Sequence, residues 1–360
     1  SNWSTSTIGT ITLSSSDTSP GSGLSSMSYE WNDSSMSSPA SFTNGQTING
    51  PSDGSHTLYL KATDVAGNET TWSGDYKQDR SNPVVSGTLS DPNWRTSYVT
   101  GVTLSTEDDS SGSGLNESRY YLGGNSDEDA ARAGTPFING YRINVYSEGT
   151  NYLHIYANDK AGRESAIWTG IYKIDTIHPI ASANKSYVGW RRDRIEIIGN
   201  ITLSASDSVS GVYSAKYWWG DSDVSAGTEF SNGDTITIPS EGENTLFVQS
   251  WDVAGNASEP WSGVYNVDSS YPEILVTGAS SAWQTTVPVI TLTATDATPG
   301  SGINYIKYRW DNSDVSGETS VSSGLTINFP SEGSHRLYVE VADVAGNISD
   351  WNGLYKVDSI

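Results

Sequence analysis

Apolar and polar residues alternate with a period of two in many short stretches of the chain, which is typical of half-buried β-strands. One such stretch places Leu58, Leu60 and Ala62 on the same face. Its counterparts further along are Leu153, Ile155 and Ala157, then Leu246, Val248 and Ser250, then Leu337, Val339 and Val341. No segment keeps a helical period, so the pattern predicts an all-β fold with these residues facing the core.

A second type of strand carries paired aromatic side chains on one face. The pairs are Tyr29 with Trp31, Tyr217 with Trp219 and Tyr308 with Trp310, and the matching stretch holds Tyr120 and Leu122. In the first copy the pattern predicts strands near residues 3–8, 10–15, 26–31, 40–43, 46–50, 56–63 and 70–78. Short strands separated by Gly, Asn, Asp and Ser turns predict a sandwich of two sheets.

The same ordered set of sequence features recurs four times, at intervals of 95, 93 and 91 residues. The clearest is Asp64-Val65-Ala66-Gly67-Asn68, repeated from Asp159, Asp252 and Asp343, with Arg163 in place of the final Asn in the second copy. A Trp-x-Gly-x-Tyr-x-x-Asp string follows each copy, beginning at Trp72, Trp168, Trp261 and Trp351. Self-similarity at one period predicts a tandem array of one structural unit.

Each of the first three copies ends on an Asp that is followed four residues later by Pro: Asp79 and Pro83, Asp175 and Pro179, and Asp268 and Pro272. These positions predict four domains, at residues 1–81, 82–177, 178–270 and 271–360. Because proline restricts the short linkers, we expect a semi-rigid, elongated array. Ser1-Asn2-Trp3 aligns with Pro92-Asn93-Trp94 inside the second copy, so we also expect the chain to come from a longer array.

With these features in place, the units resemble the bacterial immunoglobulin-like repeats of large surface proteins and adhesins. The resemblance rests on an Asp before a Gly-Ser-Gly turn, a Tyr-rich strand, an acid-Gly turn, the Asp-x-Ala-Gly-Asn hairpin and the Asp ahead of proline. It covers all four units and implies tandem immunoglobulin-like β-sandwich domains on a cell surface. Such domains serve as spacers, adhesive heads and enzyme-linked modules, so the resemblance does not identify a ligand.

Acidic residues stand at the strand ends that an immunoglobulin-like topology would bring to the domain junctions. The expected sets are Asp53, Asp79, Asp108 and Asp159; Glu148, Asp175, Asp207 and Asp252; and Glu241, Asp268, Asp296 and Asp343. Clustered carboxylates with nearby carbonyl oxygens suit Ca²⁺, which makes calcium the candidate cofactor. The alternative is that each acid caps its own turn by accepting hydrogen bonds from backbone amides.

Aromatic residues that recur in every copy are explained most economically by packing. Three others, Tyr213, Trp218 and Trp251, are confined to the third copy and are candidates for a local binding patch. The four His residues predict neither a metal site nor a catalytic triad, because no repeat brings a nucleophile and a base together. We therefore expect no catalytic residue and no enzyme.

The charge of the chain limits the partners that it can bind, and one short basic segment departs from the acidic composition of the rest. The formal charge is -23, with 42 acidic against 19 basic residues. A surface this acidic repels phosphate backbones and anionic lipid headgroups, so we expect neither nucleic acid nor an anionic membrane as a partner. The one strongly basic cluster is Arg191-Arg192-Asp193-Arg194, which we expect to be either a solvated loop or a partner for an acidic neighbour. There is no Cys, and we expect neither a membrane-spanning segment nor a signal peptide in this stretch.

Together these features predict an extracellular stalk or spacer of a bacterial surface protein or adhesin. Its partners would be neighbouring domains of the array, with no nucleic acid and no membrane contact. The alternative is a module that binds a host or cell-surface glycan or protein. Asymmetry between the copies distinguishes the spacer hypothesis from the binding-module hypothesis, since a binding module would concentrate exposed aromatic side chains in one domain.

Overall fold

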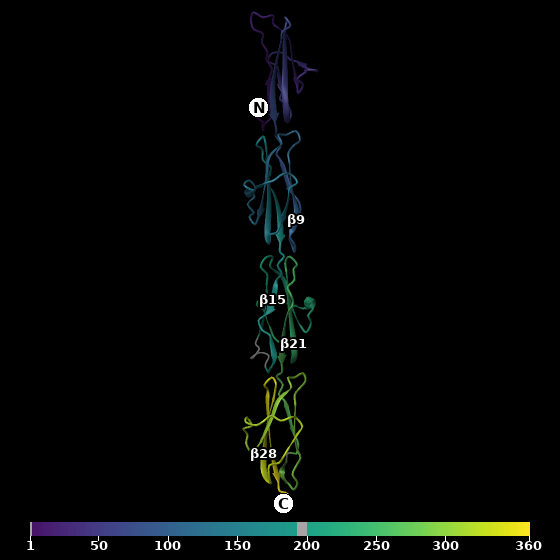
Figure 1. Ribbon diagram of the computed structural model, residues 1–360, viewed down its shortest axis with the longest axis vertical. Coiled ribbons are helices and arrows are strands. Elements are labelled where there is room, and N and C mark those ends of the chain that lie inside the picture. Colours follow the sequence, from purple (N-terminus) through teal and green to yellow (C-terminus); the bar gives the residue numbers. More distant parts are fainter. Residues whose placement is uncertain (1, 193–199, 279) are drawn as a thin grey trace. The chain divides into compact units, whose positions relative to one another are not determined.

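A computed structural model describes residues 2–192, 200–278 and 280–360, and Figure 1 traces the chain. The chain forms two compact units, Ser1–Thr176 and Ile177–Ile360. In the described residues the helical segments are two short 3₁₀ turns, neither of which has the length or apolarity to cross a membrane. Asp193 and Arg194 of the predicted basic cluster lie outside the described residues.

The first unit, coloured purple to teal in Figure 1, contains two pairs of sheets. In the first repeat, one sheet has the order β3 (Ala40–Ser41), β2 (Leu24–Trp31), β5 (Gly54–Asp64), β6 (Glu69–Gln78), and the other pairs β1 (Thr10–Thr12) with β4 (Thr47–Asn49). In the second repeat, one sheet has the order β11 (Thr135–Pro136), β10 (Leu115–Gly123), β13 (Gly149–Asp159), β14 (Trp168–Ile174), β8 (Asp91–Arg95). The other has the order β12 (Arg142–Val145), β9 (Val99–Glu107), β7 (Val84–Gly87), and η1 (Glu128–Ala131) follows β10.

The second unit repeats the same plan. In the third repeat, one sheet has the order β16 (Tyr187–Arg191), β22 (Trp261–Val267), β21 (Gly242–Asp252), β18 (Val212–Trp219), β19 (Thr228–Glu229). The other has the order β15 (Ile180–Ala183), β17 (Ile201–Ser206), β20 (Thr235–Ile236), and η2 (Val224–Ala226) follows β18. In the fourth repeat, one sheet has the order β24 (Ser280–Gln284), β29 (Ile348–Val357), β28 (Gly333–Asp343), β26 (Ile303–Trp310). The other has the order β23 (Glu273–Val276), β25 (Ile290–Thr295), β27 (Leu325–Ile327). The all-β, immunoglobulin-like tandem fold that the sequence predicts is confirmed.

The strand predicted near residues 3–8 is wrong. In that segment only Ser4 pairs, through an isolated parallel bridge to Gln78. The Ser4 hydroxyl donates to the Ser6 carbonyl oxygen and accepts from the Ser6 amide, at 2.8 and 3.3 Å. Such local side-chain bonds compete with the ladder of a sheet, which explains why the segment does not extend as a strand.

The predicted inward faces are buried in repeats two to four. Leu153, Ile155 and Ala157 are fully buried, and the equivalent residues of β21 and β28 are buried too. In the first repeat only Leu58 of the matching set is buried, whereas Leu60 and Ala62 are half-buried. The first repeat therefore has the same strand pattern but a less completely covered core.

The Trp-x-Gly-x-Tyr string has a packing explanation. Each Trp ring lies over the Gly two residues later, so a Cβ at Gly170 would stand 2.5 Å from the Trp168 ring, and one at Gly353 would stand 2.3 Å from the Trp351 ring. The Tyr of each string points into the core, where Tyr172 and Tyr355 are fully buried. In repeats two to four, Trp168, Trp261 and Trp351 pack partly buried against the cores, whereas Trp72 of the first repeat is 49% exposed.

Candidate metal centres

Two groups of three aspartates bring carboxylate oxygens within 4.8 Å of one another, one group in each unit. Asp79 follows β6, Asp108 follows β9, and Asp159 ends β13; we call these the first triad. The second triad is built in the same way from Asp268, Asp296 and Asp343. In each, the first aspartate ends one repeat and the other two belong to the next, because each repeat presents two acids at the end where the chain enters.

In the first triad, backbone amides from both repeats orient Asp79. Its Oδ1 accepts from the Ser81 amide at 3.1 Å and its Oδ2 from the Ser113 amide at 2.6 Å. Ser113 lies in the glycine turn of the second repeat, so the side chain of Asp79 connects the end of one repeat to the start of the next. Asp79 is completely buried, which makes its position depend on both repeats.

Asp159 differs from its counterparts in one oxygen. Its Oδ1 accepts from the Arg163 amide at 2.8 Å and so caps the hairpin turn. Its Oδ2 is buried and has no hydrogen-bond partner among the described residues, although the residue is only 2% exposed. A buried carboxylate oxygen without a partner is costly unless a cation or proton satisfies it.

Asp159 Oδ2 lacks a hydrogen-bond partner among the described residues because residue 163, four positions later, is Arg where the other repeats have Asn. In the second triad, Asn347 Nδ2 donates to Asp343 Oδ2 at 2.7 Å and to the Asp268 carbonyl oxygen at 2.8 Å. Arg163 occupies the corresponding position in the second repeat and instead directs its guanidinium to Asn82 Oδ1 at 2.7 Å and to the Thr5 carbonyl oxygen at 3.2 Å. The arginine therefore links the two repeats of the first unit and leaves Asp159 Oδ2 without the amide donor.

The central aspartates are affected by their charged neighbours. Burial, the largest cause, raises the pKa of Asp108, and the charges of Asp79 and Asp159 raise it further, while the amides of Asp109 and Gly114 oppose the rise. Burial likewise raises the pKa of Asp296, with added contributions from the charges of Asp268 and Asp343. Both triads are thus places where three like charges are held together at a cost.

The fourth acid that the sequence assigns to each junction does not join the triads. Asp53 accepts from Gln78 Nε2 and from Arg80 Nε, each at 2.8 Å. Glu148 accepts from the amide and hydroxyl of Thr176, and Glu241 does the same with Ser269. These acids bind the segment that leaves each repeat, so their role in the structure is to hold the linker.

The middle set stays a prediction. Asp175 belongs to the first unit, whereas Asp207 and Asp252 belong to the second. Within the second unit, Asp207 Oδ2 accepts from the backbone amides of Val209 and Gly211, and Asp252 Oδ1 accepts from those of Gly255 and Asn256. Turn capping, the alternative interpretation of these acids, is thus realised at Asp207 and Asp252, as it is at Asp79, Asp159 and Asp343.

The three aromatic residues of the proposed binding patch are distributed along β18 and β21. Tyr213 is 76% and Trp218 38% exposed, and Trp251 is half-buried. Trp251 pairs with Ser214, and Trp218 pairs with Phe247. These two pairs lie four residues apart along the strands, a distance of about 13 Å. The two indoles are therefore separate features of one sheet, and a joint binding patch stays a prediction.

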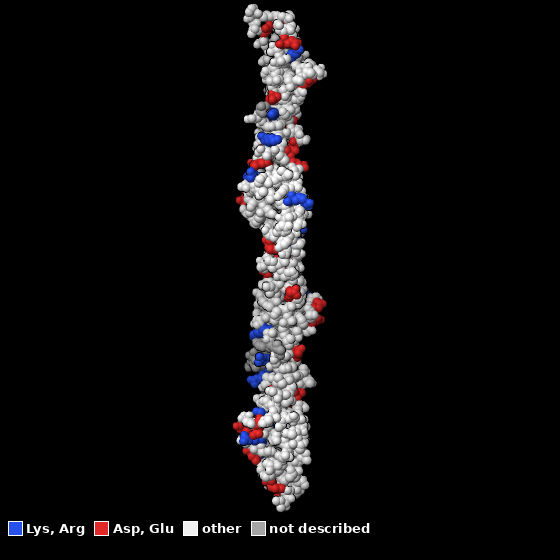
Figure 2. Space-filling view, in the orientation of Figure 1, with Lys and Arg blue, Asp and Glu red and all other residues white. Residues whose placement is uncertain are grey.

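Charged side chains on the face seen in Figure 2 are dispersed, with acidic and basic residues interspersed along each unit. The acids of the triads are largely buried and so contribute little to this surface. The candidate metal centres are thus internal features of the sandwich ends.

No protein-family model and no curated protein matches the chain in sequence. Among solved structures, it is similar to a tetra-tandem repeat in the extending region of a large adhesion protein, with 16% identity and a TM-score of 0.38 over 93% of this chain and 92% of that one. It is also similar to protocadherin gammaB7 EC3-6, with 13% identity and a TM-score of 0.38 over 98% and 95% of the two chains.

A further similar structure is the protocadherin GammaB4 extracellular domain, with 14% identity and a TM-score of 0.38. The match covers 92% of this chain and 60% of that chain. Similarity at these identities and TM-scores carries no functional argument by itself.

Proposed function

We propose that the chain is a spacer region of an extracellular adhesion-type surface protein, in which calcium ions held by the aspartate triads stabilise the junctions between successive β-sandwiches. The observation that carries the proposal is the first triad, where Asp159 Oδ2 is buried without a partner beside two further carboxylates.

The chemistry of the triads fits a divalent cation bound by oxygen. Ca²⁺ takes six to eight oxygen ligands and accepts carboxylates and backbone carbonyls in flexible geometry. Asp79, Asp108 and Asp159 would supply carboxylate oxygens, and the cation would offset the mutual repulsion that raises the pKa of Asp108. Because the ligands come from two repeats, binding would favour the state in which both ends are in register.

Calorimetric titration of the whole chain with calcium chloride tests this proposal. We expect saturable heat at millimolar calcium or below, and we expect Asp159→Asn to weaken the first site roughly tenfold, since it removes one charged ligand. The matched control is Asp64→Asn, because Asp64 caps the equivalent hairpin of the first repeat and lies in no triad. Absence of binding heat, or equal effects of the two variants, would reduce the triads to turn caps.

A binding module is the second candidate function, and the exposure of Tyr213 and Trp218 favours it. Exposed aromatic rings at one repeat suit stacking against sugars or docking to a protein. Binding of the chain to a glycan array, lost in a Tyr213→Ala, Trp218→Ala double variant, would support this function over that of a plain spacer.

A further inference from the structure

A polar hollow lies on the side of the third repeat. Its volume of about 670 Å³ is within the range of small-molecule sites, and it lies beside β18 and the segment that follows β19. Its lining includes Tyr213, Lys216, Glu229 and Asp234, together with two serines. Aromatic, cationic and anionic side chains therefore line one hollow.

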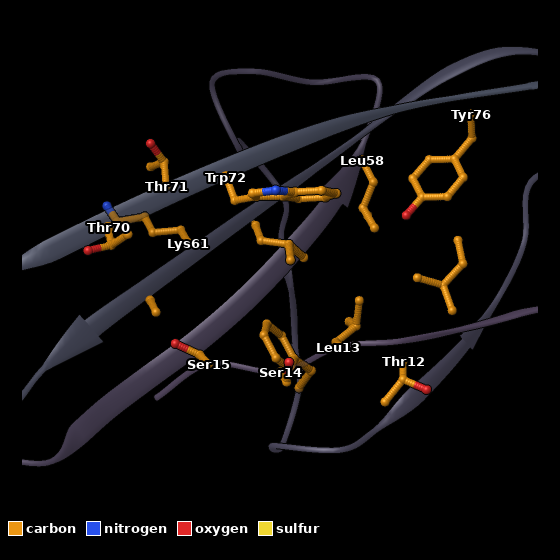
Figure 3. Close-up of a pocket in the computed structure, with 14 residues that line it drawn as sticks. Thr12, Leu13, Ser14, Ser15, Leu58, Lys61, Thr70, Thr71, Trp72 and Tyr76 are labelled. Atoms are coloured by element: carbon orange, nitrogen blue, oxygen red, sulfur yellow. The ribbon is translucent and has the colours of Figure 1, made fainter. Parts of the chain in front are cut away.

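This hollow differs in kind from one in the first repeat. Figure 3 shows the hollow of the first repeat, which has a volume of about 410 Å³, with Trp72 on one side facing Leu13. Leu13 and Leu58, which line it, belong to the core of that repeat, and Tyr76 packs against the same core. The hollow in Figure 3 is therefore an extension of the sandwich interior, whereas the lining of the one in the third repeat is largely charged or hydroxyl-bearing.

Tyr213 stands on a β-bulge that recurs in every repeat. The register between β18 and β21 shifts between Val212 and Ser214, and it shifts at the same place between β2 and β5, β10 and β13, and β26 and β28. A bulge leaves its extra residue unpaired and can redirect that side chain. The bulged positions of the other repeats hold small polar residues, namely Ser25, Asn116 and Asn304.

The fold itself therefore does not require an aromatic ring at this position. Tyr213 is 76% exposed, and its hydroxyl has no hydrogen-bond partner in the part of the chain that the structure describes. A Tyr side chain combines an apolar ring with a polar tip, and both are free here to contact a ligand.

The segment after β19 aligns with its counterparts through two backbone hydrogen bonds. The Phe230 amide donates to the Ala215 carbonyl oxygen, and the Asp234 amide donates to the Ser231 carbonyl oxygen, each at 3.0 Å. The same two bonds recur in the other repeats, between Phe42 and Met27 and between Gln46 and Thr43, between Phe137 and Ser118 and between Tyr141 and Ile138, and between Val321 and Ile306 and between Leu325 and Ser322.

This alignment shows that two acids at the hollow are particular to the third repeat. The counterparts of Glu229 are Ser41, Pro136 and Ser320, and those of Asp234 are Gln46, Tyr141 and Leu325. Both acids are exposed, and the Glu229 carboxylate has no hydrogen-bond or ion-pair partner among the described residues. Asp234 Oδ2 accepts from the Ser231 amide at 2.7 Å, which leaves Oδ1 as an acceptor. The hollow thus offers carboxylate oxygens that the sandwich does not use.

Lys216 supplies hydrogen-bond donors beside these acceptors. It is the cross-strand partner of Glu229, and its Nζ donates to the Ser225 carbonyl oxygen at 2.9 Å. An ammonium group has three donors, so two remain for other acceptors. With one cation beside two anions, the hollow combines donors and acceptors instead of presenting a single charge.

We propose that this hollow binds a neutral saccharide, one ring of which stacks on Tyr213. Hydroxyl groups of the sugar would donate to Glu229 and Asp234 and accept from Lys216. A sugar ring has an apolar face of C–H groups and hydroxyls at its rim, which suits an aromatic ring beside mixed donors and acceptors. Anionic sugars fit poorly, because the two carboxylates and the net charge of -23 repel them.

This inference rests on the second candidate function, the binding module, and not on calcium. None of the four side chains belongs to an aspartate triad. The asymmetry between the copies that a binding module requires is therefore present at this hollow, in Tyr213, Glu229 and Asp234.

The other repeats supply substitutions that remove the proposed contacts and suit the fold. Tyr213→Asn introduces the residue that the second and fourth repeats carry at the bulge, and Glu229→Ser introduces that of the first and fourth. Asp234→Gln removes the charge but keeps the turn, because Gln46 Oε1 accepts from the Thr43 amide at 3.0 Å in the first repeat.

The matched control is Tyr271→Asn. Tyr271 belongs to the same unit and is 69% exposed, but it does not line the hollow. Thermal unfolding of the four variants should match that of the unaltered chain, which separates a loss of binding from a loss of folding.

Binding of the whole chain to an array of neutral, sialylated and sulfated glycans tests the proposal, followed by calorimetric titration with the neutral glycan that gives the strongest signal. We expect signals on neutral glycans alone. Tyr213→Asn, Glu229→Ser and Asp234→Gln should each weaken the affinity roughly tenfold, since each removes one stacking or charge-assisted contact. Tyr271→Asn should bind like the unaltered chain.

Absence of binding to every neutral glycan, a preference for sialylated or sulfated glycans, or an unchanged affinity of Tyr213→Asn would overturn the proposal. Glycan binding that survives all three substitutions at the hollow would leave the binding module standing and assign it to another surface. The spacer function is independent of these outcomes, because calcium titration measures it separately.

Discussion

Residue 163 shows how one side chain changes a junction without changing the fold. Asn68, Asn256 and Asn347 each donate Nδ2 to the second oxygen of the hairpin aspartate, and Arg163 does not. The hairpin still forms, because the backbone amide of residue 163 caps Asp159 Oδ1. What changes is the carboxylate oxygen that is left free for another ligand.

Tyr172 shows how burial changes the ionisation of a single side chain. Burial raises the pKa of Tyr172 to about 12, and its hydroxyl donates to Thr88. Because the folded-state pKa lies above the ordinary value of 10.0, this group's contribution to stability is complete below that pH and is lost as the pH rises through about 12.

We expect Tyr172→Phe to lower the free energy of unfolding by about 1 kcal/mol, the usual net value of one such hydrogen bond. Chemical unfolding gives this difference, and alkaline titration of phenolate absorbance should show one fewer late-titrating group. Loss of a group that titrates near the ordinary value of 10.0, instead of a late-titrating one, would mean that Tyr172 ionises normally.

Strands in this protein depend on specific close contacts as much as on alternation. The Trp ring that covers the glycine of β29 requires the absence of a Cβ at Gly353, since the Cβ would stand 2.3 Å from the Trp351 ring. We therefore expect Gly353→Ala to destabilise the fourth repeat by about 1–3 kcal/mol, through displacement of the indole.

The control for this substitution is Gly317→Ala, because a Cβ at Gly317 would meet nothing within 4 Å. Unfolding of both variants, followed by tryptophan fluorescence, compares them in the same repeat. Equal stabilities would show that the indole shifts without cost.

Across the whole molecule, the charge balance limits the choice of partners. A net charge of -23 opposes association with polyphosphates at every ionic strength, and most strongly at low salt, where screening is weakest. We expect no retardation of duplex DNA in a gel-shift assay at about 50 mM salt. Retardation that disappears as salt is raised would contradict this and point to a local basic surface.

The sequence by itself determined the repeat, the sandwich class and the faces of the strands, because period-two alternation and turn residues act over a few positions. It correctly assigned Leu153 and Ile155 to the core and located every aspartate of both triads. It failed at residues 3–8, where local serine hydrogen bonds compete with strand pairing.

Only the tertiary structure decided which of those acids meet. Asp79, Asp108 and Asp159 are dozens of residues apart, and their meeting depends on how two repeats abut, whereas Asp53 is taken by Arg80. The free oxygen of Asp159 was likewise decided there, because Arg163 directs its guanidinium to Asn82 and Thr5, which are distant in sequence.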